Sequence, residues 1–348
     1  MPSEDADARG ILYAILALGF VFVFLISPIA WIYRGSFSSW LGNTEIAPWL
    51  VLVPLTAATI SISIALQSYV QRNRKYKHSG LAEVVGKGAY SGTALVGSFL
   101  GNGPGGLVIA LFANALGKIL ALYRKIGGVS ATPIQSLRVL SKYSSTSLSL
   151  TGSQILMTST TAIPVFFISR EYGATVLGQY ALALQALYVP SALLGTAIGS
   201  VYYQRVSERW ANGKSFQDIW ASTAKKLLFV GIPVYGIGAL ILPWAFPILF
   251  GNEWQLAGRY GVLLAISSFF SFITVPMGRS CFVVGAWWYS LLWHSARTLG
   301  TCAVVYLGWH YSWEIMPFLK ILTAQQAALY LIDYWAEFRF SRFQPGIA

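Results

Sequence analysis

A few cationic side chains lie inside long apolar stretches of this sequence. Arg297 is well inside one stretch, and His294, one helical turn before it, would share its face of a helix. Lys320 and Lys118 lie inside two others, toward the outer and the inner end respectively. A cation at the centre of a membrane helix costs about 2.5–3.5 kcal/mol to insert, so it usually faces a partner or a wet cavity. These residues therefore predict a cavity that binds an anion.

The predicted cavity carries surplus positive charge, because the sequence places no acid in the middle of an apolar stretch. Asp333 and Glu337 fall at the inner edge of the last one. This pattern favours an anionic cargo and weakens the case for a sodium or proton antiporter. For Lys118 and Lys320 the alternative is that the long side chain reaches back to the membrane surface.

Glutamines within the apolar stretches form a second group of candidates. Gln154, Gln179 and Gln185 could line the same cavity or form hydrogen bonds between helices, and the sequence leaves both interpretations open. Pro190 lies in the same stretch as Gln179 and Gln185. A proline inside a helix removes one hydrogen bond, so a kink is predicted there.

Catalytic and metal-binding patterns are missing from the sequence. His78, His294 and His310 are far apart in the predicted topology, and the two cysteines have neither metal nor disulfide spacing. No nucleophile, histidine and acid can be placed at one membrane level. The glycine-rich run 101–106 lacks the Lys-Ser/Thr end of a phosphate-binding loop. We therefore predict no catalytic residue, no metal and no cofactor.

The elements that must position these residues are membrane-spanning helices. Of the 348 residues, 55% are hydrophobic and 10% are charged, whereas soluble proteins have about a quarter of charged residues. The sequence predicts an all-α polytopic membrane protein with about ten transmembrane helices, the fifth and sixth separated by a turn at 171–173. The predicted ranges are 11–33, 46–69, 88–101, 104–123, 147–169, 177–203, 227–250, 261–277, 289–308 and 315–335.

The distribution of Lys and Arg predicts the orientation. When the N-terminus is placed inside and the spans alternate, most of the 24 Lys and Arg residues fall in inner segments, and only Arg34, Arg170 and Arg259 fall in outer loops. This bias predicts that both termini are cytoplasmic. Topology therefore accounts for the net charge of +12, and no nucleic-acid partner is predicted.

A more polar segment divides four predicted helices from six. We predict an N-terminal lobe of four transmembrane helices over residues 1–123, a cytoplasmic linker over 124–146 and a C-terminal lobe of six transmembrane helices over 147–348. A short amphipathic stretch of the linker would lie on the inner leaflet, with a docking site as the alternative.

Three blocks of sequence carry a family resemblance. They are residues 177–183 (LGQYALA), followed by Pro190 and 201–206 (VYYQRV); residues 250–258 (FGNEWQLAG); and the basic run 72–77 (RNRKYK). The first resembles the region of the seventh and eighth helices of bacterial polysaccharide and O-antigen flippases. The other two are similar to an outer and an inner loop of that family, which belongs to the multidrug/oligosaccharidyl-lipid/polysaccharide exporter superfamily.

The resemblance implies flipping of polyprenyl-pyrophosphate-linked oligosaccharide repeat units, by alternating access and without enzymatic chemistry, for lipopolysaccharide or exopolysaccharide. It implies a multi-pass protein of the bacterial cytoplasmic (inner) membrane. The implied partners are lipid-linked oligosaccharide, membrane lipids and other polysaccharide assembly proteins. The substrate-cavity candidates, which would hold the pyrophosphate or acidic sugars, are Arg297, His294, Lys320, Lys118, Gln154 and Gln185.

One departure from the family keeps alternatives open. Such flippases usually have twelve or more spans in two six-helix lobes, so the resemblance implies that the first two helices are absent from this chain. The alternatives are a non-transporting or truncated scaffold of a polysaccharide assembly complex, a membrane glycosyltransferase or ligase, and a small-molecule exporter. The enzyme is disfavoured because such enzymes usually carry large outer loops, whereas the predicted outer loops of this chain are short.

Overall fold

The computed structural model describes residues 5–40, 42, 44–73, 75–101, 103–123 and 144–344, which form helices and turns without a strand. Most of the predicted linker, residues 124–143, lies outside the described residues. The contacts within the chain define two compact units, Met1–Thr146 and Ser147–Ala348.

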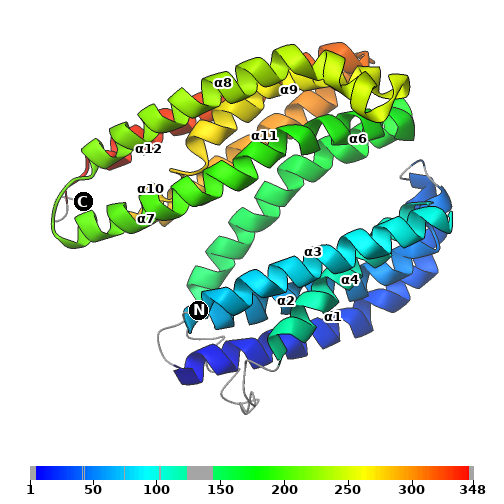
Figure 1. Cartoon of the computed structure of the whole chain (residues 1–348), viewed down its shortest axis with the longest axis horizontal. Helices are drawn as coiled ribbons and strands as arrows, with labels where there is room; N and C mark the ends of the chain where they lie inside the picture. Colours follow the sequence, from blue (N-terminus) through cyan, green and yellow to red (C-terminus); the bar gives the residue numbers. More distant parts are fainter. Residues whose placement is uncertain are drawn as a thin grey trace. The chain divides into compact units, whose positions relative to one another are not determined.

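The described residues of the N-terminal unit form a bundle of four long helices (Figure 1). They are α1 (Asp5–Trp40), α2 (Val53–Arg72), α3 (Tyr76–Phe99) and α4 (Gly103–Tyr123), with 3-10 turns at Thr44–Ile46 and Trp49–Leu52. Helices α3 and α4 lie side by side, and α2 packs on α4 and α1. Glycines allow the close approach of α3 and α4, since a Cβ at Gly97 would lie 2.9 Å from the Cα of Gly106.

The C-terminal unit contains the remaining helices. They are α6 (Ser144–Pro190), the π-helical turn η3 (Ser191–Gly195), α7 (Thr196–Ala211), α8 (Gln217–Phe250), the 3-10 turn η4 (Asn252–Trp254), α9 (Gln255–Thr274), α10 (Ser280–Val283), α11 (Trp287–His310) and α12 (Ile315–Ser341). Helix α9 packs on α8 and α12, and α11 packs on α12. Large aromatic side chains fill the core, among them Tyr202, Tyr260, Phe272 and Phe318.

Two predicted interruptions of the helices are confirmed. Gly173 breaks α6 with φ 85° and ψ 170°, a conformation that favours glycine, at the predicted turn 171–173. Pro190 ends the regular α-helix, and the π-helical turn η3 follows it directly. A span that the sequence predicts as continuous is thus divided into α6 and α7.

Two predicted boundaries are wrong, and both matter for the site. Helix α3 begins at Tyr76 rather than at residue 88, so Glu83 lies within the helix. Helix α12 continues to Ser341 rather than ending at residue 335, so Glu337 lies within it as well as Asp333. Of their surfaces, 0% and 5% are exposed. Charged residues suggested the end of an apolar span in both places, but these acids are accommodated by neighbouring helices.

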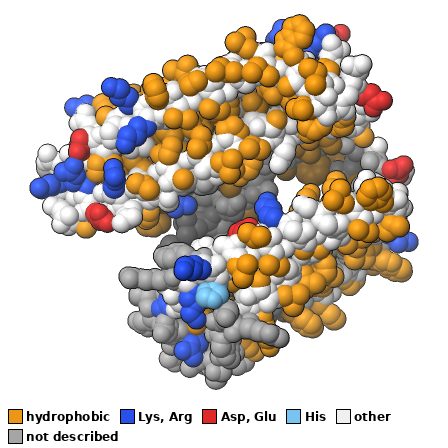
Figure 2. Space-filling model, viewed as in Figure 1, with side chains coloured by type: hydrophobic (Ala, Val, Ile, Leu, Met, Phe, Trp, Pro, Cys, Tyr) orange, Lys and Arg blue, Asp and Glu red, His pale blue; other side chains and the backbone are white. Residues whose placement is uncertain are grey.

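Seven stretches of the described residues are long and apolar enough to cross a bilayer. One of them, Thr151–Ala211, contains the break at Gly173, and the helices α3 and α11 are not among the seven. Many large apolar side chains are exposed, such as Trp244 and Ile248, and hydrophobic side chains cover the visible face of α8 (Figure 2). This is a multi-pass membrane protein; the number of spans and the side of each terminus stay predictions.

The side chain of Gln179 joins α6 to the start of α9. Its Nε2 donates to the backbone oxygen of Glu253, and its Oε1 accepts a hydrogen bond of 2.8 Å from the backbone nitrogen of Ala257. Gln179 is buried, with 5% of its surface exposed. Of the two interpretations that the sequence left open for this residue, the structure shows the hydrogen bond between helices.

Replacing Gln179 by Leu should lower the thermal unfolding midpoint of the purified protein in detergent. The change leaves the Ala257 amide without its partner and removes two buried hydrogen bonds, a loss of about 2–4 kcal/mol. The control is Gln204→Leu, which removes an exposed bond to Glu208. Equal midpoints for the two variants would show that the Gln179 contacts do not stabilise the unit.

Candidate functional site

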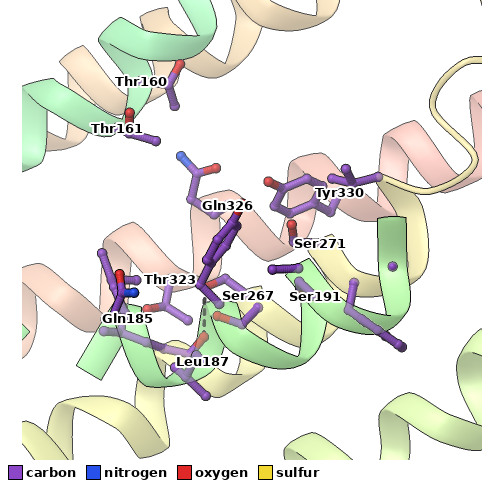
Figure 3. A pocket seen from close by; sticks show the side chains of 18 of the residues that line it. Thr160, Thr161, Gln185, Leu187, Ser191, Ser267, Ser271, Thr323, Gln326 and Tyr330 are labelled. Atoms are coloured by element: carbon purple, nitrogen blue, oxygen red, sulfur yellow. Dashed lines mark hydrogen bonds between the residues drawn. The ribbon is translucent and has the colours of Figure 1, made fainter. Parts of the chain in front are cut away.

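A cavity of about 740 Å³ lies within the C-terminal unit. Its wall comes from α6, η3, α7, α9, α11 and α12 (Figure 3). Hydroxyl and amide groups project from several of these helices, including Thr160, Ser191, Ser267, Ser271, Gln326 and Tyr330. The cavity can therefore form hydrogen bonds with a ligand rich in hydroxyl groups.

The charge of the cavity wall is entirely positive. Arg279 and Arg297 line the cavity, and no Asp or Glu is among the described residues that do so. A ligand in this space meets two guanidinium groups without a carboxylate to neutralise them. Because Coulomb interactions strengthen as water is excluded, this arrangement selects for anions.

Arg297 is held by neutral groups. Its Nη2 and Nε donate to Oε1 of Gln326 at 2.9 and 3.2 Å. The centre of the guanidinium lies 4.7 Å from the ring centroid of Tyr330 and 5.8 Å from that of Trp293, both cation–π contacts. Within the described part of the chain, no carboxylate lies at ion-pair distance from Arg297. The charge of Arg297 acts on the buried Asp333 of α12, but no ion pair within the described residues neutralises it.

Hydrogen bonds between helices fix the position of Arg297. Gln326 of α12 donates from Nε2 to the Thr301 hydroxyl of α11 at 3.0 Å, which orients the amide so that its oxygen faces the guanidinium. Thr298 of α11 forms a hydroxyl–hydroxyl bond of 2.9 Å with Thr160 of α6. The three helices that carry this part of the wall are therefore joined close to Arg297.

The π-helical turn is joined to α8 by a tyrosine. The Tyr235 hydroxyl lies 2.7 Å from Oγ of Ser191 and donates to the backbone oxygen of Leu187 at 3.2 Å. The widened turn after Pro190 changes which backbone oxygens find a partner in the helix, and Tyr235 supplies one from outside. Ser191 lines the cavity at this position.

The structure places two of the six predicted site residues in the cavity wall. Arg297 and Gln185 line it. His294 does not; it is half-buried, and its Nδ1 has no hydrogen-bond partner in the described structure. Lys320 and Gln154 are exposed and are not among the lining residues. Sequence spacing gave the depth of these residues but not the direction in which each side chain points.

Lys118 lies in the N-terminal unit and forms an ion pair. Its Nζ is 2.7 Å from Oε1 of Glu83, and the amide of Gln67 donates to the same oxygen at 3.0 Å. The expectation that Lys118 finds no acid is wrong, because α3 extends far enough to bring Glu83 into the bundle. Lys118 is therefore neutralised within its own unit.

The expectation that no acid lies inside a span also fails in the C-terminal unit. The Tyr289 hydroxyl of α11 donates to Oδ1 of the buried Asp333 at 2.8 Å. Glu337, one turn further along α12, is completely buried. The sequence analysis argued against a sodium or proton antiporter because it found no such acids. That argument no longer holds.

Sequence reasoning missed Arg279 and the serines of α9. Arg279 lies in the turn between α9 and α10, which the sequence analysis treated as an inner loop. It nevertheless lines the cavity and lies over the Tyr203 ring, 5.6 Å from the centroid. Ser267, Ser268 and Ser271 recur at helical spacing on one face of α9. That spacing is a signal that could have revealed a polar face within an apolar helix.

Comparison of the sequence with known families identifies its family. The profile of the family described as polysaccharide biosynthesis protein matches residues 3–258. The chain therefore belongs to the polysaccharide biosynthesis protein family. A comparison with curated individual proteins gives no match.

Solved structures of several transporters have a similar fold. One is a MOP superfamily transporter from Pyrococcus furiosus, with a TM-score of 0.63 and 17% identity over 97% of this chain and 79% of its own. A second is the MATE transporter ClbM in complex with Rb⁺, with a TM-score of 0.60 and 16% identity over 98% and 83%. A third is an outward-facing multidrug resistance MATE transporter, with a TM-score of 0.56 and 16% identity over 97% and 77%. At these identities the likeness shows the fold.

If the cavity holds water, a cysteine in its wall should react with an anionic methanethiosulfonate reagent. We expect Ser271→Cys to react at least tenfold faster than Ile266→Cys, whose side chain is exposed on the same helix outside the cavity. Both variants are made after Cys281→Ala and Cys302→Ser, which remove the native thiols. Equal rates would show that this face of α9 is no wetter than the lipid-facing one.

Exchanging the charges of Glu83 and Lys118 tests the ion pair of the N-terminal unit. Glu83→Lys or Lys118→Glu alone places two like charges together and should lower the yield of folded protein in the membrane. The double exchange should restore most of that yield, as measured by size-exclusion chromatography in detergent. A double variant as poor as the single ones would indicate that the two residues act independently.

Proposed function

We propose that this protein translocates polyprenyl-pyrophosphate-linked oligosaccharide repeat units across the bacterial cytoplasmic membrane by alternating access. The observation that carries the proposal is the cavity of the C-terminal unit, whose described lining residues include two guanidinium groups and many hydroxyl groups but no carboxylate. Membership of the polysaccharide biosynthesis protein family supports a saccharide cargo. The transporter fold supports translocation rather than a reaction.

Each part of this cargo finds a chemical counterpart in the cavity. Pyrophosphate and acidic sugars are anions that Arg279 and Arg297 would bind. Sugar hydroxyls would exchange hydrogen bonds with Ser267, Ser271 and Gln326. The volume of about 740 Å³ lies within the range of binding sites for organic ligands.

The remaining parts of the proposal concern topology and partners. The lobes are residues 1–123 and 147–348, the termini are cytoplasmic, and the lobes present the cavity alternately to the two sides of the membrane. The protein is not an enzyme and uses no cofactor in this scheme. Membrane lipids and other polysaccharide assembly proteins are its further partners.

Export of a small anionic molecule is the second candidate function. It is favoured by the fold shared with two MATE transporters. The same cationic wall would bind such a molecule, so the two functions differ in the cargo that accumulates when the protein is lost.

The test is deletion of the gene followed by complementation with variants. Deletion should leave lipid-linked repeat units on the inner leaflet and remove surface polysaccharide. Arg297→Ala should restore less than a tenth of wild-type export, because hydrogen bonds to a charged group contribute about 1.5–3 kcal/mol. The control is Arg259→Ala, which removes an exposed arginine of α9 outside the cavity.

Membrane protein levels must be equal for the comparison to hold. Normal export by Arg297→Ala would contradict the role of the cavity. Deletion without accumulation of lipid-linked repeat units, but with retention of a small anion, would favour the second candidate.

A further inference from the structure

The two arginines of the cavity lie at different depths of the C-terminal unit. Arg297 lies near the middle of α11 and binds Gln326 of α12. Arg279 lies in the turn between α9 and α10, at the end of the unit where α11 begins. Its guanidinium contacts the Tyr203 ring of α7.

Helix α12 provides a scale for the separation of the two arginines. Gln326 marks the level of Arg297, and Glu337 lies beside Ser280, the residue after Arg279. These two positions of α12 are eleven residues apart, which corresponds to about 16 Å along the helix axis. The Ser280 hydroxyl also bonds Tyr202 at 2.7 Å, next to the Tyr203 ring that holds Arg279 at this level. The Tyr330 ring, which also contacts Arg297, is seven residues from Glu337, so the groups that hold the two arginines lie roughly 10–16 Å apart along α12.

The two arginines place two positive charges at different levels of one cavity, so a cargo with two anionic groups at different distances from its lipid anchor would match both. We propose that the cargo carries two separate anionic groups, a diphosphate bound at Arg279 and the carboxylate of an acidic sugar bound at Arg297. This inference rests on the proposed function and specifies its substrate class. It assigns different tasks to the two arginines.

The environment of each arginine supports this assignment. Arg279 is exposed in a turn at the helix ends, the depth at which the diphosphate of a membrane-anchored lipid lies. Arg297 is half-buried further inside, where only the sugar portion would reach. The serines of α9 lie between them, since Ser271 and Ser267 are about one and two turns before the end of that helix.

The hydrogen bonding of Arg297 leaves an edge that suits a carboxylate. A guanidinium has five N–H donors, and Gln326 engages the edge formed by Nε and Nη2. The end formed by Nη1 and the second Nη2 hydrogen has no partner within the described structure. A carboxylate can accept two parallel hydrogen bonds there.

The test uses purified protein in liposomes and two synthetic lipids. Both are polyprenyl-diphosphate trisaccharides that differ only in a terminal glucose or glucuronic acid, and translocation is measured by protection from a membrane-impermeant glycosidase. Arg297→Gln should slow the acidic lipid at least tenfold and change the neutral lipid less than twofold. Arg279→Gln should slow the translocation of both lipids at least tenfold. The control Arg259→Gln, which changes an exposed arginine, should slow neither.

Arg297→Lys guards against a folding defect, because it keeps the charge and should retain more transport of the acidic lipid than Arg297→Gln. Equal slowing of both lipids by Arg297→Gln, in protein with a wild-type elution profile, would overturn the inference while leaving the proposed function in place. Wild-type protein that translocates neither lipid would contradict the proposed function itself, and the inference with it.

Discussion

The cationic cavity depends on how the Arg297 guanidinium is stabilised within a membrane protein. Burying a cation costs several kcal/mol unless the surroundings compensate. Here the compensation comes from an amide oxygen and two aromatic rings, Gln326, Tyr330 and Trp293. These groups are neutral, so they hold the guanidinium in place without cancelling its charge. Lys118 differs from Arg297 because its partner is charged: Glu83 neutralises it within the N-terminal unit. Arg297 is held by neutral groups in the wall of the cavity, whereas Lys118 belongs to an ion pair within its own bundle.

The surrounding helices make this arrangement of Arg297 possible. Thr160 and Thr301 connect α6, α11 and α12 around the arginine through Thr298 and Gln326. Gln179 joins α6 to the start of α9, which carries the serines on the other side of the cavity. The π-helical turn after Pro190 is held by Tyr235 and exposes Ser191 to the same space. Interruptions of regular helix thus occur where the cavity wall forms.

The sequence predicted the class of protein and several local features for clear physical reasons. Long apolar stretches identified the membrane helices, and glycine and proline identified the breaks at Gly173 and Pro190. The cost of a buried cation identified Arg297. The position of each residue along a membrane-spanning helix could be predicted, because this position depends only on the sequence of that helix.

Features that depend on neighbouring helices could not be read in this way. His294 and Lys320 have suitable depths but are not in the cavity wall, because the rotation of a helix is set by its packing. Asp333 and Glu337 were placed at the inner edge of the last span, and the third span was begun at residue 88, after Glu83. Hydropathy counts a charge as a boundary, whether or not another helix covers it. Arg279 was overlooked for the same reason, since a turn after a helix looks like a surface loop until the cavity beside it is known.

The most direct test of the central claim is a structure of the protein with a polyprenyl-diphosphate oligosaccharide bound. The account predicts that the ligand occupies the cavity of the C-terminal unit, with an anionic group hydrogen-bonded to at least one of Arg279 and Arg297 and sugar hydroxyls against Ser267 and Ser271. A lipid bound outside this cavity, with both arginines uncontacted, would contradict it.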